Sequence, residues 1–135
     1  MHSNDAAPAP PHRLLLVVED DEPIRRLVAA IVLDEPGLHL LEAHDGAEAL
    51  AAFAKVRPDV VLLDLQLPGV DGLEVCRRLK ADPETAGVPV VGFSAGYNEA
   101  GARAAGCDDF VAKPFELQDL VARLRCWLAS DATGR

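Results

Sequence analysis

An apolar run that ends in a single carboxylate constrains this chain more than any other feature. Val60 to Leu63 are four consecutive aliphatic residues, Asp64 follows them directly, and Pro68-Gly69 then signals a turn. Such a run, bounded by turn residues, predicts a strand buried on both faces of a parallel sheet. Asp64 would stand at the carboxyl end of that strand, which is where open α/β sheets bind ligands. Because a buried charge is costly without partners, we expect other parts of the chain to supply them.

The rest of the chain alternates strand patterns with helical patterns. Apolar runs predict strands at about 14–18, 38–42, 60–64, 88–93 and 110–112, and amphipathic segments predict the helices between and after them. Asp45 with Glu48, and Asp71, are expected to cap two of these helices, whereas the glycine-containing stretch 96–106 predicts only a short, poorly specified one. This alternation predicts an α/β fold: a flavodoxin-like, doubly wound, five-stranded parallel sheet in the order 2-1-3-4-5, with helices on both faces.

Length, charge and cysteine content limit the classes of protein to consider. At 135 residues we expect one domain over 13–129, a disordered N-terminal tail over 1–12 and a polar C-terminal tail over 130–135. The net charge of −9 predicts no direct binding to nucleic acid and none to a membrane surface. Three cysteines without paired spacing indicate free thiols and a cytoplasmic protein. No apolar run is long enough to cross a bilayer.

Acidic residues also follow the first predicted strand. Glu19 and Asp20 come directly after Leu14 to Val18. In the expected strand order the first and third strands are neighbours on either side of the switch point, so Glu19, Asp20 and Asp64 should converge. Carboxylates that share a small site repel one another unless a cation intervenes, and an all-oxygen ligand set favours Mg²⁺, with Mn²⁺ as the alternative.

Two more strand ends add complementary groups. Ser94 offers a hydroxyl after the fourth strand, and Lys113 offers a cation after the fifth. A carboxylate, a divalent metal, a hydroxyl and a lysine around one point suit the transfer of a phosphoryl group to the carboxylate.

These segments together resemble the response-regulator receiver domains of two-component signalling, in the chemotaxis-regulator-like form. The resemblance spans residues 13–129 and is carried by Val17–Arg26 (VVEDDEPIRR), Asp64–Gly72 (DLQLPGVDG), Ser94-Ala95 and Lys113–Phe115 (KPF). It implies that Asp64 is the phosphoacceptor, with Mg²⁺ held by Asp20, Glu19, Asp64 and the backbone carbonyl of Gln66. It further implies that Ser94 and Lys113 bind the phosphoryl group, that Phe110 is the aromatic switch residue, and that the peptide bond before Pro114 is cis.

The resemblance implies a phosphorylation switch in a phosphorelay rather than an enzyme with a separate substrate. Its partners would be a histidine kinase or histidine phosphotransfer protein and a downstream protein target, with a phosphorylation-dependent dimer as an option. The sequence departs from the usual pattern at Glu19, Ser94 and Phe110, where aspartate, threonine and tyrosine are commoner, and in a fourth helix region about three residues short. The alternatives are a flavodoxin-like binding module, an unphosphorylated interaction module, and a phosphatase with an aspartyl-phosphate intermediate.

Overall fold

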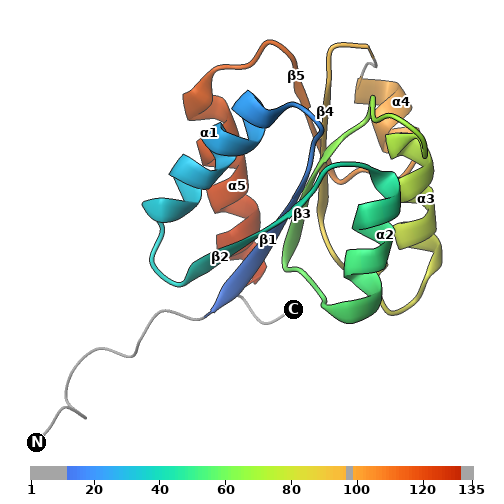
Figure 1. Ribbon diagram of the computed structural model, residues 1–135, viewed down its shortest axis with the longest axis horizontal. Helices are drawn as coiled ribbons and strands as arrows, with labels where there is room; N and C mark the ends of the chain where they lie inside the picture. The colour runs from blue at the N-terminus through green and yellow to red at the C-terminus, as the bar shows by residue number, and fades with distance from the viewer. Residues whose placement is uncertain (1–11, 97–98, 132–135) are drawn as a thin grey trace, which may run out of the picture.

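In the part of the chain that the structure describes, five strands alternate with five helices (Figure 1). The computed structural model describes residues 12–96 and 99–131. Most of the predicted tails over 1–12 and 130–135 therefore lies outside the described residues, although α5 extends to Asp131. The strands are β1 (Arg13–Val18), β2 (Leu38–Ala43), β3 (Val60–Asp64), β4 (Val90–Ser94) and β5 (Asp109–Ala112). The helices are α1 (Glu22–Leu33), α2 (Gly46–Lys55), α3 (Gly72–Ala81), α4 (Glu99–Ala104) and α5 (Leu117–Asp131).

The strands form one parallel sheet in the order β2-β1-β3-β4-β5, which confirms the predicted fold class. β3 lies at the centre, and all five of its residues are buried. Its register pairs Leu63 with Val18 of β1 and Asp64 with Phe93 of β4. The carboxyl ends of β1, β3 and β4 therefore reach the same edge of the sheet.

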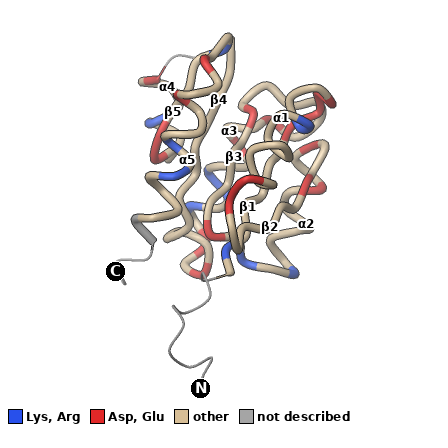
Figure 2. Tube along the Cα trace, turned by 90° about the vertical axis from the view of Figure 1, so that its left-hand side faces the viewer, with Lys and Arg blue, Asp and Glu red and all other residues tan. Residues whose placement is uncertain are grey.

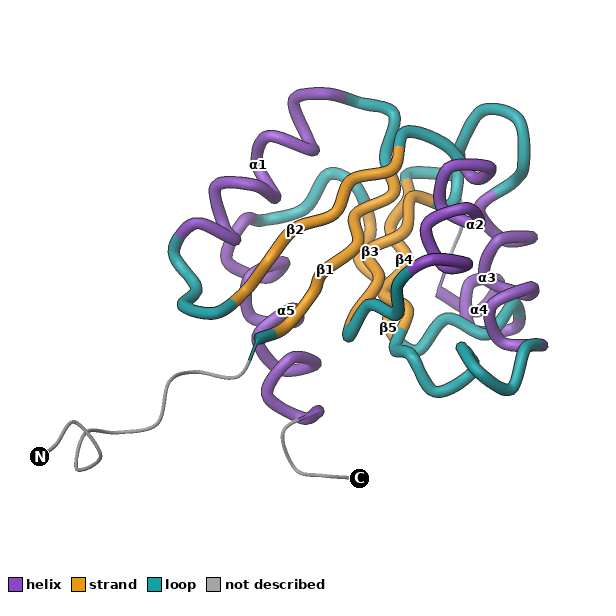
Figure 3. Tube along the Cα trace, turned by 60° about the horizontal axis from the view of Figure 1, so that its bottom comes forward, coloured by secondary structure: helices purple, strands orange, loops and turns teal. Residues whose placement is uncertain are grey.

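Helices cover both faces of the sheet, and each face has its own core (Figures 1 and 3). On one face α1 and α5 bury Val28, Ile31 and Leu120 against β1, β3 and β4. On the other face α2, α3 and α4 pack on the sheet through side chains such as Val75 and Ala102. Within the described residues, no helix combines the length and apolar character needed to cross a membrane.

Charged side chains on the helices are largely arranged in pairs. Figure 2 shows basic residues lying beside acidic ones on several elements. Three pairs join residues four apart on one helix: Arg26–Glu22, Arg78–Glu74 and Arg103–Glu99. Because these pairs face solvent, each contributes at most about 1 kcal/mol to stability, and the two cores carry the fold.

The structure places β4 two residues later than the sequence pattern predicted. The backbone N–H of Val88 donates to Thr85 in a turn, and the Val88 carbonyl accepts from Lys80 Nζ at 2.9 Å. These contacts use the hydrogen-bonding groups that a strand would need, so β4 begins at Val90. The predicted short helix in 96–106 is present as the six residues of α4.

The turn from β3 into α3 is closely packed. Asp71 caps α3 by accepting the Leu73 N–H at 3.0 Å, as predicted, and Asp45 caps α2 by accepting the Glu48 N–H at 2.8 Å. Gly72 lies against the end of β3: a Cβ atom at this position would be 2.4 Å from the Asp64 carbonyl oxygen and 2.6 Å from Leu65 Cα. Because both neighbours are backbone atoms, only glycine lets α3 approach Asp64 this closely.

Gly72→Ala should therefore destabilise the protein by about 2 kcal/mol or more, because the clash must displace either α3 or the end of β3. Urea unfolding followed by far-ultraviolet circular dichroism measures the change. Gly87→Ala is the matched control, because a Cβ atom there meets nothing within 4 Å. Equal stability of the two variants would contradict the proposed steric role of Gly72.

Candidate functional site

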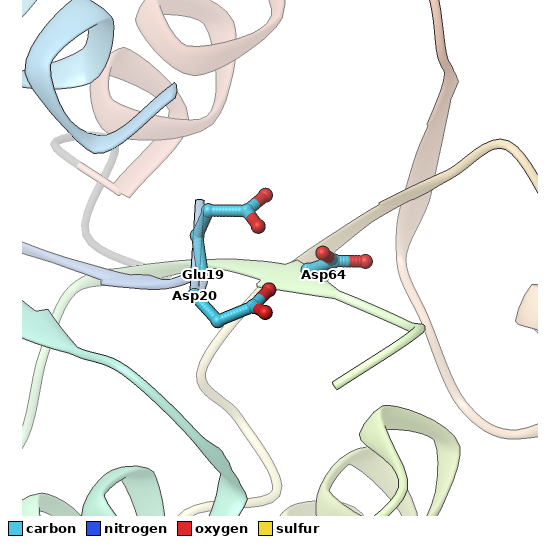
Figure 4. Close-up of side chains that lie close together, drawn as sticks. All are labelled: Glu19, Asp20 and Asp64. Atoms are coloured by element: carbon cyan, nitrogen blue, oxygen red, sulfur yellow. The ribbon is translucent and has the colours of Figure 1, made fainter. Parts of the chain in front are cut away.

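Three carboxylates meet at the carboxyl edge of the sheet. Glu19 and Asp20 directly follow β1, and Asp64 is the last residue of β3. One oxygen from each carboxylate lies within 4.8 Å of the others, and Figure 4 shows the three side chains turned toward a common point. Glu19 and Asp64 are only 1% and 3% exposed, whereas Asp20 is open to solvent. The adjacency of β1 and β3 thus brings the sequence-predicted acids together.

The proximity of these acids is electrostatically unfavourable. Two unit charges about 4 Å apart repel by about 4 kcal/mol at an effective dielectric constant of 20. The pKa of Glu19 is raised to about 7. Burial is the largest cause and the hydrogen bond with Asp64 is the second, whereas the hydrogen bond from the Asp21 backbone N–H partly opposes the rise. The cluster is therefore suited to bind a positively charged group.

Lys113 supplies one positive charge. It directly follows β5, and its Nζ lies 3.1 Å from Glu19 Oε1 and 3.3 Å from Asp64 Oδ2. The ammonium also lies 4.6 Å from the centroid of the Phe93 ring. Burial alone lowers the pKa of Lys113, but the hydrogen bond with Glu19 and the charge of Asp64 outweigh it and raise the pKa above its usual value. The peptide bond between Lys113 and Pro114 is cis.

The donor atoms fit a divalent cation. When all three acids are ionised, one lysine leaves two negative charges uncompensated, and the oxygen ligands are those that Mg²⁺ and Mn²⁺ prefer. The backbone N–H of Gln66 donates to Asp64 Oδ1 at 2.8 Å, which holds the Gln66 main chain beside the carboxylate. Asp20 is exposed, so one side of the cluster is open to solvent.

Ser94 is engaged by the Gln66 side chain. The Ser94 hydroxyl donates to Gln66 Oε1 at 3.0 Å, and the Gly96 N–H reaches Gln66 Oε1 at 3.1 Å and Ser94 Oγ at 2.9 Å. A Cβ atom on Gly96 would lie 2.0 Å from Gln66 Nε2, so the amide occupies the space above this glycine. Sequence reasoning missed this contact, because residues 28 apart show no local signal that they touch.

Phe110 does not join the acidic cluster. It lies in β5, is 8% exposed, and belongs to the core on the α2–α3–α4 face together with Ala102 and Cys107. The two acids that follow Asp20 also point elsewhere: Glu22 pairs with Arg26, and Asp21 is exposed. The site therefore consists of Glu19, Asp20, Asp64 and Lys113, with Gln66 and Ser94 beside it.

Sequence comparison finds one protein family over most of the chain. The response regulator receiver domain family matches residues 15–125. The phosphate regulon transcriptional regulatory protein PhoB of Pseudomonas aeruginosa is 37% identical over 90% of this chain and 54% of its own length. The DNA-binding response regulator MtrA of Mycolicibacterium smegmatis is 42% identical over 86% of this chain and 51% of its own. The chain thus spans about half the length of these relatives.

Solved receiver structures share the fold. The phosphorylated cyanobacterial phytochrome response regulator RcpA superposes with a TM-score of 0.77 and 28% identity, covering 88% of this chain and 96% of its own. A second structure is the receiver domain of the sensor histidine kinase PA1611 from Pseudomonas aeruginosa, with magnesium coordinated in its active-site cleft. It superposes with a TM-score of 0.77 and 26% identity, covering 87% of this chain and 98% of its own. The acidic cluster of this chain is compatible with divalent metal binding of that kind.

One prediction about partners is wrong. From the net charge of −9 we expected no direct nucleic-acid binding, yet the relatives include a protein named as a DNA-binding response regulator. The physical reason lies in the extent of the match. The charge describes a chain that covers about half of each relative, so it cannot exclude DNA contact by regulators of this kind.

Asp20→Asn should weaken Mg²⁺ binding by at least about tenfold, because it removes an exposed anionic ligand, and should not lower the melting temperature. Isothermal titration calorimetry and thermal unfolding measure the two effects. Asp21→Asn is the matched control, since it removes the same charge from the next residue, which lies outside the cluster. Equal loss of Mg²⁺ affinity in both variants would show that Asp20 acts only through its negative charge and not as a metal ligand.

Proposed function

This chain belongs to the response regulator receiver domain family, and we propose that it accepts a phosphoryl group on Asp64 from the phosphohistidine of a histidine kinase or phosphotransfer protein. One observation carries the proposal. Asp64 stands at the end of the central strand, and one of its carboxylate oxygens lies within 4.8 Å of one oxygen each of Glu19 and Asp20. Lys113 Nζ lies 3.3 Å from Asp64 Oδ2. This arrangement provides a nucleophile, a set of oxygen donors for a metal, and a fixed positive charge.

In the proposed reaction an Asp64 carboxylate oxygen forms the new bond to phosphorus, while the phosphorus–nitrogen bond of the phosphohistidine breaks. The imidazole leaves with the electron pair of that bond, and because its other ring nitrogen carries a proton, it is released as the neutral ring. Glu19, Asp20, Asp64 and the Gln66 carbonyl would hold Mg²⁺, which neutralises negative charge on the carboxylates and on the incoming phosphoryl group. Lys113, already held between Glu19 and Asp64, would pair with a phosphoryl oxygen.

We propose that phosphorylation changes the partner of Ser94. In the structure its hydroxyl donates to Gln66 Oε1, so it must leave this acceptor before it can bond a phosphoryl oxygen. The Gly96 backbone would move together with the Ser94 hydroxyl, because the Gly96 N–H contacts both Ser94 and Gln66. The change at Asp64 would thereby reach the loop that follows β4, and Phe110 would respond through its packing. The downstream protein target would bind to this side of the molecule.

Two further expectations belong to the same proposal. We propose that the chain turns over no substrate other than its own phosphorylated Asp64. We also propose a cytoplasmic location, which the free thiols of Cys76, Cys107 and Cys126 support, because unpaired cysteines are typical of reducing compartments.

Incubation with acetyl phosphate and Mg²⁺ should add one phosphoryl group to Asp64, because the site holds both the nucleophile and the metal ligands. Intact-mass spectrometry with peptide mapping measures the adduct, and chelation of the metal should abolish it. Asp64→Asn should give no adduct. An adduct that persists in Asp64→Asn, or that forms equally without Mg²⁺, would refute the proposed function.

Gln66→Met should raise the affinity for beryllofluoride, a phosphoryl mimic, by roughly two- to tenfold, because loss of one hydrogen bond frees the Ser94 hydroxyl at no cost to the bound state. The Gln66 backbone carbonyl remains in place. The same substitution in a Ser94→Ala background is the control and should have a clearly smaller effect, since only the Gly96 N–H then remains to be released from Gln66. If Gln66→Met acts equally in both backgrounds, its effect does not pass through Ser94.

A further inference from the structure

Two buried thiols lie in contact at a place that the phosphorylation chemistry does not use. Cys76 of α3 is fully buried, and Cys107, between α4 and β5, is 5% exposed. Their sulfur atoms are 3.7 Å apart although the residues are separated by 31 positions in sequence. Cys126, the third cysteine, is exposed on α5. The fold thus brings together two thiols whose sulfurs need to approach by only about 1.7 Å more to reach bonding distance.

The two thiols are chemically unequal. The hydrogen bond with Cys107 lowers the pKa of Cys76, and the positive charge of Lys80 adds to this effect. Conversely, the hydrogen bond with Cys76 and burial raise the pKa of Cys107. Lys80 is held in place, because its ammonium donates to Asp108 at 2.7 Å and to the carbonyl of Val88 at 2.9 Å. Of the two thiols, Cys76 is therefore the one that loses its proton more readily, and thiol oxidation begins from the thiolate form.

The turn that carries Cys107 provides a route for the remaining movement. Gly106 precedes it in a left-handed conformation with φ of 110°. The turn is attached to α4 by the bond from the Cys107 N–H to the Ala102 carbonyl at 3.0 Å, and α4 itself has only six residues. So short a helix makes few internal hydrogen bonds, and such segments open locally at low free energy. Opening of α4 would move Cys107 aside and uncover the neighbouring Cys76 sulfur to a small oxidant, and closing would bring the Cys107 sulfur back against it.

We propose that a peroxide converts the Cys76–Cys107 thiol pair into a disulfide that joins α3 to the turn between α4 and β5. The Cys76 thiolate attacks the peroxide, the oxygen–oxygen bond breaks, and Cys76 becomes a sulfenic acid as hydroxide leaves. The Cys107 sulfur then attacks the Cys76 sulfur, and the hydroxyl leaves as water with the proton of Cys107. The pair loses two electrons, and hydrogen peroxide is reduced to two molecules of water.

The full chain with Cys126→Ser tests this pair without the exposed thiol. After treatment of the folded protein with hydrogen peroxide, the intact mass should fall by two hydrogen atoms. Non-reducing digestion should yield one peptide that joins Cys76 to Cys107, and dithiothreitol should restore the original mass. Because the bond closes a loop of about 30 residues, the oxidised form should melt at least about 5 °C higher than the reduced form.

Two further variants separate pairing from simple oxidation. Two variants, Cys76→Ala and Cys107→Ala, are each combined with Cys126→Ser. Neither should lose two hydrogens on oxidation, and circular dichroism is used to check that both are folded. In the unaltered chain, oxidation of the exposed Cys126 shows that enough peroxide has been added, because this thiol should react first. The proposal is overturned if Cys76 and Cys107 stay reduced under conditions that oxidise Cys126. It is equally overturned if they form sulfinic acids without a cross-link, or cross-link only in urea.

Discussion

The repulsion among Glu19, Asp20 and Asp64, and its relief by positive charge, is the constraint on which the functional end of the molecule depends. Three carboxylates with oxygens within 4.8 Å of one another are unfavourable in a partly buried site. Burial raises the pKa of Glu19, and the hydrogen bond and charge of Asp64 add to the rise. Lys113 offsets part of this repulsion through contacts of 3.1 Å and 3.3 Å. The remaining negative charge is compatible with binding of a divalent cation, which in the proposed function would also contact the phosphoryl group.

The buried core holds this unfavourable arrangement in place. β3 is buried along its whole length and carries Asp64 at its end, so the carboxylate cannot move away without disturbing the centre of the sheet. Gly72 lets α3 pack against the same strand end. Cohesion of the two apolar cores thus sustains a site that is electrostatically costly, as is common where function requires preorganised charge.

The residues next to the site connect it to the second half of the chain. Gln66 is two residues beyond Asp64, and its amide holds both Ser94 and Gly96, so the loop after β4 is attached to the loop after β3. Beyond that loop lies α4, the shortest helix of the described chain, followed by the turn that carries Cys107. A change at Asp64 and a change at the thiol pair would both act on the segment around α4, whose six residues make it the helix most easily opened.

Features that depend on local chemistry and on strand order could be predicted from the sequence alone. The apolar runs, the caps at Asp45 and Asp71, and acids at two strand ends were enough to predict the sheet order and the meeting of Glu19, Asp20 and Asp64. Only the tertiary structure decided the contacts between residues far apart in the chain: the Gln66–Ser94 bond, the start of β4 at Val90, and the Cys76–Cys107 contact. The reason is physical: periodicity reports which face of an element is buried, whereas side-chain partners depend on packing distances between elements that no local pattern records.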